Sequence, residues 1–189
     1  MKIASFDIGI RNLAYCVIES EVDEGKLVCN IVDWKIITLC EKQEKVKQIG
    51  INLLCQRLIQ KLDECEIFCN NSLDQCVLEN QPCYMNPKMK SVQMMLFTYL
   101  IMNHIPTVKM FSPRNKLNIY DGPEIQCNLK SKYSRTKFLG IQYCKYMIRN
   151  TIVKDFFEKQ KKKDDLADSF LQGVLYLKKQ YPEEILEII

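Results

Sequence analysis

Strand-like apolar runs occupy the start of the chain, and helical periodicity follows them. The runs KIASFDIG (2–9) and NLAYCVIES (12–20) are typical of strands, and a tight turn containing Gly9 joins them. KLVCNIVDWKIITL (26–39) follows a polar turn and predicts a third strand. Three strands in succession, separated by short turns, predict an antiparallel meander.

From residue 44 onward the apolar positions recur every three or four residues, interrupted by two short apolar runs. Val46, Ile49, Leu53 and Leu54 open this pattern in a predicted helix at 44–64. Short buried strands are predicted at 75–80 and 107–113, and further helices at 87–103, at 134–150 with Ser134 as its cap, and at 164–180 with Asp164 as its cap. This order predicts one α/β domain over residues 1–189, with a mixed five-stranded sheet and helices on both faces.

Composition limits the class of protein. The chain has 189 residues, the length of one domain, and 47% of them are hydrophobic, enough for a sizeable core. Its longest apolar run, MMLFTYLIM (94–102), has about half the length that a membrane span needs, so a core helix is expected there. The MKIA start lacks a signal-peptide pattern, and we expect an intracellular protein without membrane contact.

The ten cysteines predict neither a metal site nor a disulfide framework. None forms a C-x-x-C pair and the chain has one histidine, so the close ligand pairs of a zinc site are missing. Most of the cysteines stand among apolar residues, where a free thiol behaves as a small hydrophobic side chain. We expect reduced cysteines in a reducing compartment.

Positive charge is concentrated in the middle of the chain. Residues 88–149 contain eleven Lys and Arg but two acids, a local charge of +9, whereas the rest of the chain carries −5. A basic middle in an otherwise acidic chain favours a surface that faces a polyanion, although lysines scattered over a solvated surface would give the same count.

Four carboxylates stand where a sheet could bring them together. Asp7 interrupts the apolar first strand, and Glu79 follows the buried run CVL of a later strand. Asp165 and Asp168 are three residues apart on the last helix and share a face of it. Because ligands of open α/β sheets gather at the carboxyl ends of the strands, all four could surround one pocket.

Such a pocket needs positive charge, since a carboxylate is costly to bury in an apolar strand unless it is paired. Oxygen ligands suit Mg²⁺, and two ions about 3.5–4 Å apart stabilise the attacking and leaving oxygens of a phosphodiester displacement. Gly9 allows a tight turn and a close approach of phosphate. Each of these acids, taken alone, also has a simpler structural interpretation. Asp164 and Asp165 could be no more than helix caps, and Glu79 could be no more than the last residue of a strand. The combination favours a metal site.

Lysines flank this acidic set in KYSRTK (132–137) and KKK (161–163). A lysine close to the site could stabilise charge that develops on a phosphate. A solvated loop is the simpler interpretation of 161–163, and contact with a phosphate backbone is the alternative.

Three motifs in this order resemble the signatures of the RuvC-like Holliday junction resolvases, and most closely those of the poxvirus-type resolvases of large DNA viruses. They are FDIGIRNLAY at the start, VLENQP (77–82) and KKKDDLADSF (161–170). NPKMKSVQMML (86–96) and YSRTK (133–137) add to the match, which covers nearly the whole chain.

The resemblance implies an RNase H-like fold, two Mg²⁺ ions that Mn²⁺ can replace, and paired, symmetric nicking of four-way DNA junctions by a homodimer. In such viruses it also implies a role in DNA recombination or concatemer processing, in the host-cell cytoplasm or at the site of viral replication. Helix 87–103 or the C-terminal ILEII could form the dimer interface, although the apolar pattern of each suits the hydrophobic core equally well.

The resemblance also assigns roles by position. The metal-binding acids are Asp7, Glu79, Asp165 and Asp168. The catalytic lysine is Lys137, with Lys132 as the second candidate because the segment 117–132 is longer than expected. The basic charge of the chain, rather than the resemblance, suggests the expected DNA contacts, which are Arg11, Lys88, Lys90, Arg114, Lys132 and Arg135.

Three other functions share parts of this pattern. A ribonuclease H or an RNA-processing nuclease could use the same fold and acids, and substrate preference would separate them. Actin-like ATPases and sugar kinases also open with D-x-G on a first strand, but they need two such domains, and 189 residues are too few. A non-catalytic junction-binding module would have no need of four intact acids.

Overall fold

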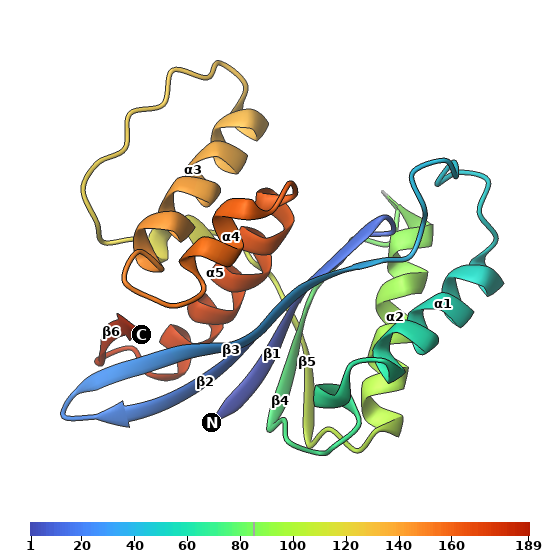
Figure 1. Ribbon diagram of the computed structural model, residues 1–189, viewed down its shortest axis with the longest axis horizontal. Helices are drawn as coiled ribbons and strands as arrows, with labels where there is room; N and C mark the ends of the chain where they lie inside the picture. The colour runs from blue at the N-terminus through green and yellow to red at the C-terminus, as the bar shows by residue number, and fades with distance from the viewer. Residues whose placement is uncertain (85) are drawn as a thin grey trace.

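A mixed sheet of six strands forms the centre of the computed structural model, which describes residues 1–84 and 86–189 (Figure 1). The strand order is β5-β4-β1-β2-β3-β6. The strands are β1 (Lys2–Asp7), β2 (Asn12–Asp23), β3 (Lys26–Thr38), β4 (Gln75–Glu79), β5 (Thr107–Phe111) and β6 (Ile185–Ile188).

The predicted antiparallel meander β1–β2–β3 is confirmed, and parallel strands lie on both sides of it. β1 pairs antiparallel with β2, and β2 pairs antiparallel with β3. β4 pairs parallel with β1, and β5 pairs parallel with β4. Because parallel neighbours end at the same edge of a sheet, the last residues of β1 and β4, Asp7 and Glu79, come to lie side by side.

The expected number of five strands is wrong by one, because the C-terminal segment forms β6. Its residues pair parallel with Lys26–Cys29 of β3. Leu186 and Ile188 pack against the hydrophobic core, so this acidic segment has an apolar face that sequence alone left unassigned. The segment therefore belongs to the sheet rather than forming a free tail.

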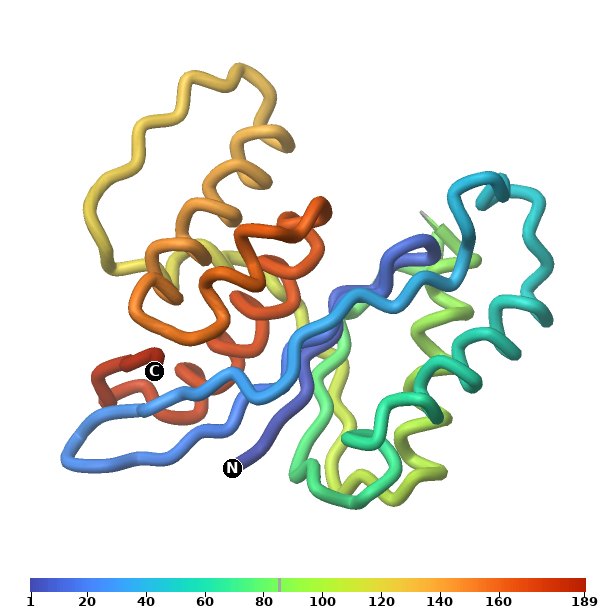
Figure 2. Tube along the Cα trace, in the orientation of Figure 1, coloured from blue at the N-terminus to red at the C-terminus, as the bar shows by residue number. Residues whose placement is uncertain are grey.

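Helices cover both faces of the sheet, as predicted (Figure 2). α1 (Ile51–Asp63) and α2 (Pro87–Met102) lie on one face, and α3 (Lys132–Met147), α4 (Lys154–Lys159) and α5 (Lys163–Gln180) lie on the other. Two short 3-10 helices, η1 (Glu66–Phe68) and η2 (Lys116–Ile119), connect them to the strands. Among the described residues, no helix has the length and apolar character needed to cross a bilayer.

Each face of the sheet has its own hydrophobic core, because successive side chains of a strand point to opposite sides. Phe6 and Tyr15 pack with Phe68 under α1 and α2. Trp34 stacks on Phe157, with ring centroids 5.0 Å apart, on the side of α4 and α5. Five cysteines are fully buried in these cores, and all ten are free thiols.

α5 packs closely against the middle of the sheet. The buried Gln172 amide donates hydrogen bonds to Ser5 Oγ and the Phe6 carbonyl, both at 3.1 Å. Gly173 permits this approach, since a Cβ atom there would lie 2.8 Å from Ile18 Cδ1. Consequently the first turns of α5 extend past the carboxyl ends of β1 and β4.

Three predicted helix starts or caps are wrong, and a side-chain contact accounts for each of them. The first helix begins at Ile51 rather than at residue 44, because the segment before it is held by tertiary contacts described below. α3 begins at Lys132, and its N-cap is Ser131, whose Oγ accepts from the Ser134 N–H. Asp164 does not cap α5, because its carboxylate pairs with Lys137.

Candidate active site

The turn after β1 fixes the direction in which Asp7 points. Asp7 shares a face of the strand with Ser5, and this is the face that α5 covers. Gly9 is required in the turn, because a Cβ atom there would lie 2.0 Å from the Asn12 carbonyl oxygen. The motif D-x-G-x-x-N thus places a carboxylate at the strand end and returns the chain immediately into β2.

Three of the four predicted acids converge at this edge of the sheet. Burial, followed by the negative charges of Glu79 and Asp168, raises the pKa of Asp7 well above its usual range. A hydrogen bond with Glu79 adds to this effect, and Lys116 opposes it. Glu79 in turn accepts a hydrogen bond from Gln81 Nε2 at 2.7 Å. The cluster is therefore crowded with negative charge.

Lys116 supplies the positive charge at this cluster, although it stands in none of the sequence motifs. Its Nζ lies 2.7 Å from Asp168 Oδ1, and its side chain is only 14% exposed. Lys116 opens η2, which follows β5 and packs against α5. Its position in the sequence could have indicated this role. β5 runs parallel to β4, so the residues that follow β5 lie at the edge of the sheet where the acids were expected.

Asp165, the fourth predicted acid, has a different partner. Asn12 Nδ2 donates a hydrogen bond to Asp165 Oδ2 at 2.9 Å. Burial and the charge of Asp164 raise the pKa of Asp165, while the Asn12 hydrogen bond lowers it. Asp165 lies one helical turn before Asp168 on the same face of α5, next to the cluster of Asp7, Glu79 and Asp168.

Lys137, the predicted catalytic lysine, pairs with Asp164 rather than with the cluster. Its Nζ lies 2.5 Å from Asp164 Oδ2 and 5.1 Å from the centre of the Tyr133 ring. Burial pulls the pKa of Asp164 upward, yet the Lys137 ammonium holds it below its usual value. The pair joins the start of α3 to the start of α5. Lys132, the second candidate, is exposed at the first position of α3.

The predicted DNA contacts fall into two groups. Arg11, Lys88 and Lys90 point into the protein, where Arg11 Nη2 donates to the Glu44 carbonyl at 2.6 Å and Lys90 Nζ donates to Gln93 Oε1 at 3.1 Å. Arg114 and Lys132 are exposed. Arg135 is also exposed, although its guanidinium donates to the Leu129 carbonyl at 3.2 Å.

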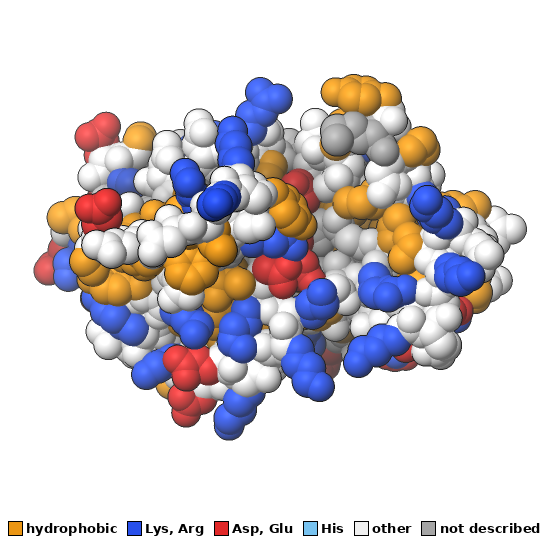
Figure 3. Space-filling view, turned by 90° about the horizontal axis from the view of Figure 1, so that it is seen from above, with side chains coloured by type: hydrophobic (Ala, Val, Ile, Leu, Met, Phe, Trp, Pro, Cys, Tyr) orange, Lys and Arg blue, Asp and Glu red, His pale blue; other side chains and the backbone are white. Residues whose placement is uncertain are grey.

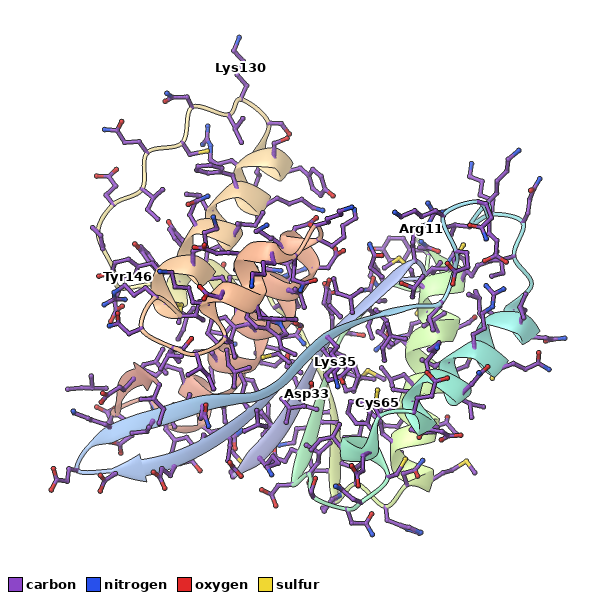
Figure 4. The ribbon with its side chains drawn as sticks, in the orientation of Figure 1. Arg11, Asp33, Lys35, Cys65, Lys130 and Tyr146 are labelled. Carbon is purple, nitrogen blue, oxygen red and sulfur yellow. The ribbon has the colours of Figure 1, made fainter. Side chains whose placement is uncertain are left out.

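The acidic cluster lies in a hollow between the two layers of helices. Figure 3, which views the molecule from above, shows acidic side chains in this hollow and Lys and Arg side chains on both sides of it. In Figure 4, Arg11 lies on the α2 side, and Lys130 lies across the hollow in the loop before α3. The arrangement is an acidic floor between basic rims.

The donor set suits a hard divalent cation. Three carboxylates around one ammonium leave excess negative charge, and carboxylate oxygens are the ligands that Mg²⁺ prefers. Within residues 1–84 and 86–189, no three His, Cys, Asp or Glu side chains lie close enough to enclose an ion as they stand. Binding would therefore draw the side chains of Asp7, Glu79 and Asp168 closer together.

Comparison with known proteins gives one family and one fold. The family described as "Poxvirus A22 protein" matches residues 1–180. An uncharacterized protein of Acanthamoeba polyphaga mimivirus is 36% identical over 152 residues, which are 72% of this chain. The chain spans only 37% of the length of that relative.

Two solved structures share the architecture. Thermus thermophilus RuvC superposes with a TM-score of 0.62 at 14% identity, covering 96% of this chain and 98% of RuvC. The fowlpox virus Holliday junction resolvase superposes with a TM-score of 0.60 at 20% identity, covering 95% of this chain and 99% of the resolvase. At these identities the likeness establishes the fold, and the predicted RNase H-like architecture is confirmed.

Proposed function

Because the chain belongs to the Poxvirus A22 protein family, we propose that it is a Holliday junction resolvase, an endonuclease that cuts four-way DNA junctions by paired nicks. The observation that carries this proposal is the convergence of Asp7, Glu79 and Asp168 at the carboxyl ends of β1 and β4. The fowlpox virus resolvase, which has this fold, has also been solved in complex with Holliday junction DNA. A role in viral DNA recombination or concatemer processing inside the infected cell follows from the proposal.

Asp7, Glu79 and Asp168, with Asp165 beside them, would hold the metal in this proposal. When bound, divalent cations (two Mg²⁺ ions in our proposal) would neutralise charge on the attacking and leaving oxygens of the scissile phosphate. The chain itself orients these acids. β1 and β4 fix two of them at one edge of the sheet, and α5, anchored through Gln172, brings the others over that edge.

Lys116 is our choice for the lysine that acts at the scissile phosphate. It contacts an acid of the cluster, whereas Lys137 and its partner Asp164 are engaged with each other. A largely buried ammonium beside the reacting phosphate would stabilise charge that develops in the transition state. In the resting protein the same ammonium orients Asp168.

A homodimer would provide two such sites for the two nicks. α1 and α2 present an apolar groove of about 670 Å³, lined by Cys55, Ile59, Met94, Met95, Tyr99 and Met102. Met94 is 43% exposed and Met102 is 72% exposed, which is unusual for large apolar side chains that cluster. The C-terminal ILEII is less suited to this role, because it is paired within its own sheet as β6. We therefore place the second copy on α1 and α2.

A cleavage assay on four labelled substrates tests the proposal. The substrates are a four-way DNA junction, a linear duplex, a single-stranded DNA and an RNA–DNA hybrid, each with Mg²⁺ or with a chelator. The proposal predicts symmetric nicks in opposite strands of the junction, in Mg²⁺ only. Preferential cleavage of the hybrid would move the function to a ribonuclease, and tight junction binding without cleavage would indicate a non-catalytic module.

A further inference from the structure

The segment between β3 and α1 forms the rim of the hollow on the α2 side. This β3–α1 segment (residues 39–50) rises beside the edge where β1 and β4 end (Figure 1). It carries three exposed lysines, Lys42, Lys45 and Lys47. These lysines lie outside residues 88–149, the region whose charge first suggested a polyanion-facing surface.

Three cations of the surrounding protein hold the β3–α1 segment in place. Lys88 Nζ donates to the carbonyls of Val46, Lys47 and Ile49 at 2.8, 3.1 and 2.9 Å, which uses all three of its hydrogens. Arg11 donates to the Glu44 carbonyl at 2.6 Å. The segment is therefore fixed by contacts from the β1–β2 turn and from the first turn of α2.

Arg57 completes this support and cancels one acid of the segment. Its two terminal nitrogens contact the two oxygens of the Glu44 carboxylate at 2.6 and 2.9 Å, and one of them also donates to the Leu39 carbonyl. This bidentate pair holds the pKa of Glu44 low, at about 2, so Glu44 stays ionised and neutralised by Arg57. Of the charged side chains that remain, three are lysines and one is Glu41.

These cations have roles that differ from those expected from the sequence, in which Arg11 and Lys88 were DNA contacts. Lys88 and Arg11 point inward and donate hydrogen bonds to backbone carbonyls, so they are poorly placed to reach a phosphate. Lys42, Lys45 and Lys47 point outward on a backbone that those contacts immobilise. A basic surface that is held rigid loses less conformational entropy when it binds a polyanion.

The opposite rim of the hollow is also basic. The loop before α3, the start of α3 and the turn before α5 lie on this side (Figure 1), and they carry the exposed residues Lys130, Lys132, Arg135, Lys161 and Lys162. Figure 3 shows Lys and Arg on both sides of the acidic floor. A nucleic acid strand that reached the acids would therefore pass between two basic walls rather than along one.

We propose that Lys42, Lys45 and Lys47 form a second phosphate-contacting surface, which binds branched DNA opposite the wall formed by residues 130–137. This inference rests on the proposed function. It adds a second place on the protein, the β3–α1 segment, where the junction DNA is held. The contacts are with the sugar-phosphate backbone and carry no sequence preference.

The test compares two triple variants of equal charge change. Lys42→Gln/Lys45→Gln/Lys47→Gln removes the proposed surface, and Lys26→Gln/Lys61→Gln/Lys179→Gln removes three solvent-accessible lysines from other parts of the molecule. Binding to a four-way junction is measured in a chelator over a range of salt concentrations. We expect the first triple to lower the slope of log K against log salt by about 2 to 3 and to weaken binding at 0.1 M salt by at least about tenfold, while the second triple changes neither.

Each other outcome has a distinct meaning. Equal losses in both triples, or no loss in the first, would overturn the inference and leave the resolvase proposal intact if the wild-type protein still binds and nicks the junction. A first triple that changes the oligomeric state while keeping the slope would assign this surface to the second copy. A wild-type protein that does not bind the junction would overturn the proposed function together with this inference. Thermal melting of both triples confirms that they are folded.

Discussion

At the end of β1, the Asp7 carboxylate lies beside two other acids, with Lys116 as the nearby cation. A buried carboxylate in such surroundings has a folded-state pKa above its unfolded value of about 3.9. The stability that comes from protonating it is fully present below that value and is lost as the pH rises through the folded-state pKa. Above its unfolded pKa, Asp7 therefore lowers the stability of the metal-free fold, which is the expected sign for a metal ligand.

Asp7→Asn should for this reason stabilise the metal-free protein. We expect its melting temperature near pH 7 in a chelator to exceed that of the wild type by about 2–5 °C, because an amide is cheaper than an acid to bury beside Glu79 and Asp168. The difference should shrink as the pH falls toward 4. Differential scanning calorimetry measures both effects, and an unchanged or lower melting temperature at neutral pH would show that Asp7 is already compensated.

Asn12 acts on the site through Asp165. Its hydrogen bond at 2.9 Å fixes the orientation of that carboxylate, and the Gly9 turn brings Asn12 to the correct place. Residues that orient metal ligands typically affect metal affinity or activity by about 10–100-fold when they are replaced.

Asn12→Ala should lower cleavage by about 10–100-fold and raise the Mg²⁺ concentration needed for half-maximal rate, with junction binding unchanged. Asn118→Ala, at an exposed asparagine, is the control. A uniform loss of rate that extra Mg²⁺ does not restore would argue against positioning of Asp165 by Asn12.

Elements with a clear period were predictable from the sequence, whereas segments held by tertiary contacts were not. The meander and the parallel strands β4 and β5 follow from apolar runs and turns. The β3–α1 segment carries Val46 and Ile49 at helical spacing, yet it forms turns because Lys88 takes the carbonyls that a helix would use internally. β6 is four residues long, and only its pairing with β3 defines it.

The same distinction holds for the candidate site, where residues on regular elements were predictable and residues positioned by tertiary packing were not. Asp7 and Glu79 end neighbouring strands and Asp168 lies on a long helix, so regular elements place all three acids. Lys116 lies in a four-residue 3-10 helix after β5, and no pattern fixes where such a turn points. Lys137 lies on a regular helix, but its choice of Asp164 over the cluster depends on how α3 packs against α5.

Lys116 and Lys137 should therefore differ in effect. Lys116→Gln should reduce cleavage by about 100-fold, since it removes the cation beside the acids, and should also lower the melting temperature, since Asp168 loses its partner in a largely buried pair. Lys137→Gln should lower the melting temperature by a few degrees, since it breaks the link between α3 and α5, with a smaller effect on cleavage. Parallel kinetics and melting curves measure both, and the reverse assignment of effects would return the catalytic role to Lys137.

For the whole molecule, the acidic hollow and the apolar groove lie on different surfaces. The hollow lies between the two helical layers, and the groove lies between α1 and α2. A copy bound at the groove would leave the hollow of each protomer open. A two-fold dimer of this kind suits a four-way junction, which requires one nick in each of two strands.

Met94→Lys should therefore give a monomer. The side chain is 43% exposed, so the fold should tolerate the change, while a charge in the groove would oppose association. We expect light scattering to give the mass of one chain and the junction to receive unpaired single nicks. Ile152→Lys, at a 93% exposed position outside the groove, is the matched control. A Met94→Lys protein that remains a dimer would place the interface elsewhere.

Direct measurement of divalent cation binding shows whether Asp7, Glu79 and Asp168 form the metal site of a nuclease. Isothermal titration of Mg²⁺ or Mn²⁺ into wild-type protein and into Asp168→Asn, with the exposed Asp155→Asn as control, needs no DNA. We predict saturable binding to the wild type and to Asp155→Asn, and binding weakened by at least about tenfold in Asp168→Asn. Equal binding by all three proteins, with cleavage retained in Asp168→Asn, would contradict the account.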